Sequence, residues 1–108
     1  MISRHWKGIV KRDHAHRYVA HLQGDTFPQL ASLSGFVRAT ILRREVTGGT
    51  EFQVVTVWSS LQEIEAFAGA DIEKAVVPPV ARAMMVEFDR KVVHYEVAGT
   101  FEPRIRGA

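Results

Sequence analysis

Two periodicities of apolar residues alternate along the first third of the chain. Residues 2–10, ISRHWKGIV, mix apolar and polar positions as a half-buried strand does. The next stretch carries apolar residues at helical spacing, namely Ala15, Tyr18, Val19 and Leu22. Asp13 offers an N-cap for this helix, and Gly24 and Pro28 are expected to interrupt it before a second short turn at FPQLASL. The pattern therefore predicts a strand followed by a broken helix.

Two strands joined by a tight turn are expected next. Residues 36–46 and 51–58 alternate in polarity and are rich in β-branched and aromatic side chains. The intervening TGGT places Gly48 and Gly49 where a hairpin turn needs positive φ angles. A β-hairpin is the firmest local prediction.

A second helical region and a last strand are expected after the hairpin. Ser60 and Glu63 have the spacing of a capping box ahead of LQEIEAFAG. The pattern then favours a short helix at 81–88, ARAMMVEF, and a strand at 90–98, RKVVHYEVA. Residues 99–108 are interpreted as a C-terminal tail.

The resulting order, β-α-β-β-α-β, is that of the ferredoxin-like α+β fold, with a four-stranded antiparallel sheet and both helices on one face. We expect one such domain over residues 1–98. Residues 36–42 carry apolar side chains on both faces of the predicted hairpin, so the second face also needs a cover. A second copy of the chain is the simplest cover, which predicts a homodimer joined through its sheets.

Composition narrows the class of protein. The 108 residues are 46% hydrophobic and 24% charged, with a formal net charge of +2 and no run of like charges, so no affinity for nucleic acid or membrane is indicated. The chain has no cysteine, which excludes disulfides and thiolate catalysis. No signal peptide or membrane-spanning segment is evident, and we expect a cytoplasmic protein. The central strand also lacks the glycine and basic residues of an RNA-recognition motif.

Three histidines cluster in RDHAHRYVAHL, at positions 14, 16 and 21. On a helix, His14 and His16 point about 200° apart, and His14 and His21 stand about 10 Å apart along the axis. No pair has the i, i+4 spacing of a helical zinc site, so no metal is expected. They are interpreted as solvated helix residues, although His14 and His21 flank Tyr18 and so have a route to a pocket.

The succession of EFQVVTVWSSLQEIEAFAG, AVVPPVARAMM and VVHYEV resembles the antibiotic biosynthesis monooxygenase family over almost the whole of residues 2–97. The resemblance implies a dimeric α/β barrel with a pocket between sheet and helices in each protomer. It also implies one of two activities in that pocket: oxidation of electron-rich polyphenols by O2 without a cofactor, or binding and degradation of haem.

The sequence departs from both patterns. The haem-degrading branch has an asparagine on the first strand, a tryptophan in the second helix and a ligating histidine beyond it. This chain offers His5 or Arg4, Phe67 and Val77 in those regions. Without the axial histidine, haem degradation is disfavoured and no cofactor is expected. The quinone-forming monooxygenases also use a pocket asparagine, and this chain contains none.

Cofactor-free oxygenation needs a base, an apolar wall and donors for a developing oxyanion. The predicted catalytic residues are His94 and His5, which are expected to be neighbours on adjacent strands, with His94 the more important. The predicted substrate-binding residues are Trp6, Trp58, Arg38 and Tyr95, with Tyr18 as a further oxyanion donor. Structural roles compete with each of these: His94 at a dimer interface, Trp58 in the core and Arg38 at the surface.

The sequence thus predicts a cofactor-independent monooxygenase that oxidises a quinol- or anthrone-like small aromatic molecule with O2. The alternative is a non-catalytic dimer of the same fold that binds a small ligand or regulates another process. Fold alone does not separate the two, because function depends on the site.

Overall fold

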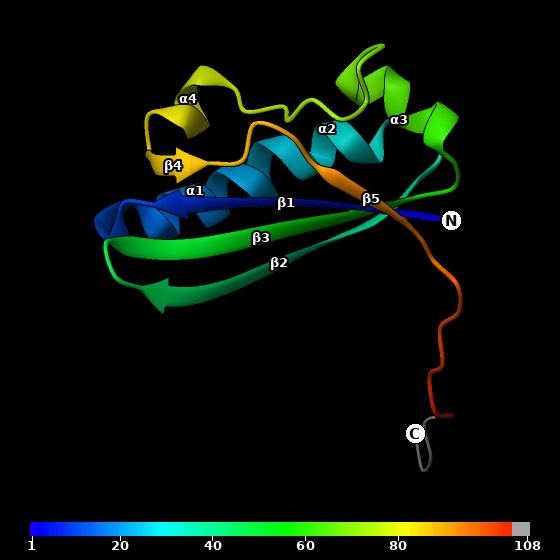
Figure 1. Cartoon of the computed structure of the whole chain (residues 1–108), viewed down its shortest axis with the longest axis horizontal. Helices are drawn as coiled ribbons and strands as arrows, with labels where there is room; N and C mark the ends of the chain where they lie inside the picture. The colour runs from blue at the N-terminus through cyan, green and yellow to red at the C-terminus, as the bar shows by residue number, and fades with distance from the viewer. Residues whose placement is uncertain (105–108) are drawn as a thin grey trace.

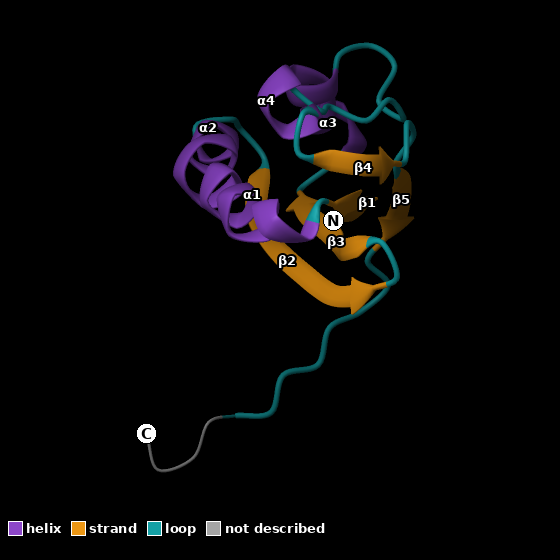
Figure 2. Ribbon diagram, turned by 90° about the vertical axis from the view of Figure 1, so that its left-hand side faces the viewer, coloured by secondary structure: helices purple, strands orange, loops and turns teal. Residues whose placement is uncertain are grey.

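The computed structural model describes residues 1–104, in which five strands form one antiparallel sheet and the helices cover one of its faces (Figures 1 and 2). The elements in chain order are β1 (Ile2–Val10), the 3₁₀ turn η1 (Arg12–His14), α1 (Ala15–His21), the π-helical turn η2 (Leu22–Thr26), α2 (Phe27–Ala31), β2 (Phe36–Val46), β3 (Gly49–Trp58), α3 (Leu61–Ala68), α4 (Pro79–Arg82), β4 (Met85–Phe88) and β5 (Val93–Glu96). This arrangement confirms the predicted ferredoxin-like α+β fold.

The strand order is β2-β3-β1-β4, and β5 also pairs with β1. Two consecutive short strands therefore occupy the edge where one strand was expected: β4 pairs near Gly8 and β5 pairs near Arg4. The central strand β1 is bonded on both sides along most of its length. It is thus the element from which a side chain can reach the middle of the molecule.

The helix predicted at 81–88 is wrong. Only Pro79–Arg82 is helical, and Met85–Phe88 forms β4. A helix of one turn gains little from its own hydrogen bonds, whereas residues 85–88 complete the free edge of β1. Met85 is buried there against the helix layer.

The first helical region is less broken than expected. Gly24 lies within η2, which links α1 to α2 without an intervening loop, and Pro28 is accommodated in the first turn of α2. Asp13 does not cap α1, which has no side-chain cap. The predicted apolar stripe is confirmed, since Tyr18 and Leu22 are buried against the sheet.

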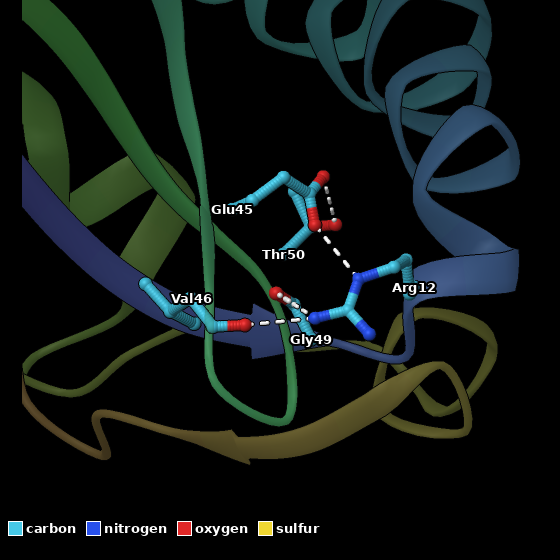
Figure 3. A network of polar contacts seen from close by, with 5 residues as sticks. All are labelled: Arg12, Glu45, Val46, Gly49 and Thr50. Carbon is cyan, nitrogen blue, oxygen red and sulfur yellow. Dashed lines mark hydrogen bonds and ion pairs between the residues drawn. The ribbon is translucent and has the colours of Figure 1, made fainter.

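The β2–β3 hairpin is confirmed, with a difference at its turn. Gly48 has a φ of 94°, but Gly49 already belongs to β3 and is needed for space, because a Cβ there would collide with the Val10 carbonyl. Arg12 holds this turn against η1: its Nε donates to Glu45 Oε2 at 2.8 Å, and its Nη2 donates to the carbonyls of Val46 and Gly49 (Figure 3).

Two apolar clusters lie between the sheet and the helices. One is built around Tyr18 and Phe52, and the other around Trp58 and Ile64. Ser60 caps α3 as predicted, since its Oγ accepts from the backbone N–H of Glu63.

Residues 97–104, the described part of the predicted C-terminal tail and its approach, form no helix or strand, and residues 105–108 of that tail lie outside the described residues. Residues 97–104 run away from the body of the molecule (Figures 1 and 2), and Phe101 is 89% exposed. Within residues 1–104 no helix has both the length and the apolar character needed to cross a membrane.

Candidate functional site

A cavity lies between the helices and the sheet, at the boundary of the two apolar clusters. Its volume is about 70 Å³. Helix α1, turn η2, strands β1 and β3, helix α3 and the segment 76–78 all contribute to its wall. Most of the wall is apolar, and its polar side chains are Arg4, Trp6, Tyr18, His21, Thr26 and Thr56. An apolar pocket with a few convergent polar groups is typical of a small-molecule site.

Arg4 is the charged centre of this cavity. It is only 4% exposed, because β1 is covered by helices on this face. Its Nη1 donates to the Ile72 carbonyl and its Nη2 to the Lys74 carbonyl, the latter at 2.9 Å. Its Cζ lies 5.5 Å from the centre of the Phe67 ring, a cation–π contact. Burial lowers the pKa of Arg4 to about 10, so the guanidinium still carries its charge at neutral pH.

His94 lies next to Arg4 and does not line the cavity. Its Nε2 is 3.0 Å from Nη1 of Arg4. A guanidinium can only donate, so this imidazole nitrogen accepts and the proton of neutral His94 is on Nδ1. Burial, and then the positive charge of Arg4, lowers the pKa of His94. The arrangement makes His94 a neutral support for Arg4.

Two other polar side chains approach the cavity from α1. Tyr18 is 3% exposed, and its hydroxyl has no hydrogen-bond partner among residues 1–104. Burial raises the pKa of this phenol, so Tyr18 stays protonated and is a donor. The side chain of His21 is 11% exposed, with Nε2 3.3 Å from the Thr26 hydroxyl and Nδ1 3.8 Å from Asp25. These two groups give the cavity a hydroxyl donor and an imidazole.

The aromatic side chains form a wall in two layers. Trp6 lines the cavity, and its Nε1 donates to the Asp89 carbonyl at 3.0 Å. Phe67 also lines the cavity and stacks on Trp58, with ring centres 6.0 Å apart. Trp58 is fully buried behind Phe67, where its Nε1 donates to the Thr56 hydroxyl. Of the two tryptophans predicted to bind substrate, the structure places Trp6 at the cavity and Trp58 in the core.

The remaining predicted site residues lie on the opposite face of the sheet. Arg4 and Trp6 point toward the helices, so the alternation of β1 turns His5 away from the cavity. His5 contacts Ser3, with Nε2 2.7 Å from Oγ, and packs edge-on against Tyr95 with ring centres 4.9 Å apart. Arg38 is exposed and pairs in register with Val57 on the same outer face.

The expectation that His5 and His94 are neighbours in one site is therefore wrong. Their strands are adjacent, but His94 is opposite Arg4, and His5 is opposite Val93. Residues one position apart along a strand point to opposite faces. The two histidines are consequently on different sides of the sheet.

Sequence reasoning missed the importance of Arg4, and it gave His21 only a route to a pocket beside its interpretation as a solvated helix residue. Ile2, Arg4, Trp6, Gly8 and Val10 occupy one face of β1 by period-two alternation, and this signal places Arg4 among buried positions. His21 lies three residues after Tyr18 on the same helix face, so the apolar stripe brings it to the cavity. The other two helix histidines lie elsewhere: His16 borders a separate surface hollow, and His14 Nδ1 is buried with no partner within residues 1–104.

Comparison with known proteins connects this fold to monooxygenases. No protein-family profile matches the chain, and no curated protein sequence does. Several solved structures match, and two of them are crystal structures that match over nearly their whole lengths. One is a Bacillus cereus protein provisionally assigned as an antibiotic biosynthesis monooxygenase, with a TM-score of 0.65 and 16% identity over 97% of this chain and 98% of that one.

The second is a monooxygenase from the gene ActVA-Orf6 of Streptomyces coelicolor, solved in complex with nanaomycin D. Its TM-score is 0.66 and its identity 21%, over 95% of this chain and 92% of that chain. At these identities the likeness is one of fold. This chain has the ferredoxin-like fold of the antibiotic biosynthesis monooxygenases over nearly its full length.

Proposed function

We propose that the protein is a monooxygenase of the antibiotic biosynthesis type, which oxidises a small electron-rich aromatic molecule with O2 and no cofactor. The observation that carries the proposal is the cavity between helices and sheet, apolar and aromatic with a few polar groups, in a fold shared with monooxygenases. An apolar wall suits both an aromatic ring and O2.

The proposed reaction converts a phenol with a free para position, or an anthrone, into the corresponding quinone. One oxygen atom of O2 becomes bonded to the ring carbon, and the other leaves as water. The two hydrogen atoms of that water come from the substrate: from a phenol, one leaves the ring carbon and one the hydroxyl group, and from an anthrone both leave the methylene carbon that becomes the new carbonyl. The substrate supplies all four electrons that O2 accepts, so no external reductant is required.

The residues of the cavity fit three roles in this scheme. His21 is the proposed general base that forms the phenolate, because it is the imidazole that lines the cavity. Tyr18 donates a hydrogen bond to the anionic oxygen, since its hydroxyl is protonated and has no partner within residues 1–104. Trp6 and Phe67 form the aromatic wall. His94 is the proposed positioning residue: it accepts a hydrogen bond from Arg4 and so holds the guanidinium at the cavity.

Oxygen uptake with anthrone and a panel of naphthols tests the proposal. Wild-type protein should consume one molecule of O2 for each molecule of quinone formed. His21→Ala should lower kcat/KM by about 10²–10⁴-fold, as expected for loss of a general base. The matched control is His16→Ala, an exposed histidine of the same helix, which should change it by less than about 3-fold.

Two outcomes would contradict this scheme in different ways. Full activity in His21→Ala would remove His21 from the role of base. If the panel bound but consumed no oxygen, the protein would instead be a non-catalytic ligand-binding protein of the same fold.

We also propose a homodimer joined through the face of the sheet that the helices leave uncovered. Large apolar side chains remain exposed on that face: Leu42 is 50% exposed, Val93 52% and Tyr95 56%. Val93 and Tyr95 flank His94 on β5, and Leu42 is on β2, so the apolar positions span the sheet from edge to edge. In this arrangement His5 and Arg38 lie at the interface between subunits and not in the cavity.

A further inference from the structure

We infer that the cavity binds an aromatic acid, whose ionised carboxylate is held by the guanidinium of Arg4. The inference rests on the proposed function for the aromatic part of the ligand and on Arg4 for the acidic part. It differs from the proposed function because an oxidisable phenol or anthrone need not carry an acid group.

The buried charge of Arg4 has no anionic partner in the described part of the chain. Its three hydrogen-bond partners are two backbone carbonyls and the imidazole of His94, and all three are neutral. No ion pair with Arg4 exists within residues 1–104, and none of the described residues that line the cavity is acidic. Charges buried to this degree are normally paired. A ligand anion would supply the missing partner.

Arg4 also keeps N–H donors that its contacts among residues 1–104 do not use. A guanidinium has five N–H groups, and the three contacts of Arg4 use two on Nη1 and one on Nη2. Nε–H and one Nη2–H have no partner in the described part of the chain. Guanidinium groups commonly bind the two oxygens of a carboxylate through two N–H groups at once. One cation with two free donors therefore suits a single planar monoanion.

The guanidinium of Arg4 is held in place by its neighbours. The carbonyls of Ile72 and Lys74, the His94 imidazole and the Phe67 ring fix the guanidinium from four directions. A fixed cation loses little conformational entropy when an anion binds. The same Phe67 ring faces the cavity, so the ligand's ring and its carboxylate meet adjacent surfaces.

The test is calorimetric titration with a matched pair of hydroquinones: gentisate, which carries a carboxylate, and gentisamide, its neutral amide. At neutral pH the wild-type protein should bind gentisate at least about tenfold more tightly, as expected for a hydrogen bond to a charged group. Acetate is a third ligand, and it should bind much more weakly than gentisate because it lacks the ring.

Variants assign the preference to Arg4. Arg4→Gln should reduce the ratio of the two affinities to about one, chiefly by lowering the affinity for gentisate. Arg4→Lys should retain part of the difference between the two affinities, because lysine keeps the positive charge but cannot donate two hydrogen bonds from one planar group. Arg17→Gln is the control, since it removes an exposed arginine from α1 and should leave the ratio unchanged. Circular dichroism checks that each variant folds. The comparison of gentisate with gentisamide on the wild-type protein does not depend on any variant.

Several results would contradict an aromatic-acid site at Arg4. Equal affinities in the wild type, no binding of either hydroquinone at millimolar concentration, or acetate as tight as gentisate would overturn it. A ratio that persists in folded Arg4→Gln would overturn the role of Arg4. Failure of the proposed function is separately visible: tight gentisate binding with no oxygen uptake by any phenol would refute the oxygenase and leave the aromatic-acid site standing.

Discussion

At the scale of single residues, the contact between Arg4 and His94 should make stability depend on pH. Protonation of His94 would remove the acceptor at Nε2 and place two cations side by side, with only Glu73 acting in the opposite direction. The pKa of folded His94 is below the ordinary value of 6.5. The stabilisation is therefore complete above 6.5 and is lost as the pH falls through 6.5 toward the folded-state pKa.

We expect the free energy of unfolding to decrease between about pH 7 and about pH 5, and we expect His94→Gln to weaken that dependence. The glutamine oxygen can accept from Arg4 without titrating. Urea denaturation at several pH values measures the slope, and His16→Gln is the control with an exposed histidine. An unchanged slope in His94→Gln would mean that the histidine does not support Arg4.

Tyr18 offers a second test at this scale. Its hydroxyl has no protein partner within residues 1–104, so Tyr18→Phe should change the free energy of unfolding by less than about 0.5 kcal/mol. Loss of a donor to the substrate anion should nevertheless lower kcat/KM by about tenfold or more. Tyr95→Phe tests the substrate-binding role that the sequence predicts for Tyr95, in the same oxygen-uptake assay. If activity falls in Tyr95→Phe and not in Tyr18→Phe, the assignment of Tyr18 is wrong.

At the scale of elements, the junction between α2 and β2 depends on one glycine. Gly35 has a φ of 85°, and a Cβ there would overlap the Glu63 side chain of α3. Gly35→Ala should therefore lower the free energy of unfolding by more than about 1 kcal/mol. Gly24→Ala is the matched control, because a Cβ at Gly24 would meet no other part of the chain within 4 Å and the φ of Gly24 is not positive. Thermal denaturation of both variants should rank Gly24→Ala as the more stable.

At the scale of the whole molecule, the uncovered sheet face should decide the oligomeric state. Leu42→Glu places a charge in the proposed interface, where it would be buried without a partner. We expect the wild type to sediment as a dimer and Leu42→Glu to shift toward the 12.1 kDa monomer. Leu61→Glu on α3 is the control, because Leu61 is 44% exposed on the helical side. A wild type that sediments as a monomer at micromolar concentration would refute the dimer.

The cavity depends on the same whole-molecule arrangement. Its wall draws on two strands, the α1–η2–α2 path, α3 and the segment before α4, and no one of these elements has the complete set of polar groups. The π-helical turn η2 contributes Leu22 and Thr26 to the wall, and such turns often occur at functional sites. Helix packing against the sheet therefore creates the site.

Local pattern was sufficient for much of the fold. Alternation predicted the hairpin strands, the Ser60 cap predicted the start of α3, and the stripe through Tyr18 and Leu22 predicted the buried face of α1. The local pattern predicted the wrong structure at 81–88, because pairing with the free edge of β1, a long-range contact, makes residues 85–88 a strand. A short apolar segment does not by itself distinguish helix from strand.

The sequence by itself determined the succession of elements as far as α3, the ferredoxin-like fold class and the apolar character of both faces of the hairpin, because these follow from propensity and from periods of two and 3.6 residues. Only the tertiary structure decided which polar residues meet. Arg4 contacts His94 because β1 and β5 pair in one register, although the two residues are 90 positions apart. A shift of that register by one residue would turn His94 to the other face. Register between distant strands is set by packing of the whole molecule, and the candidate site depends on it.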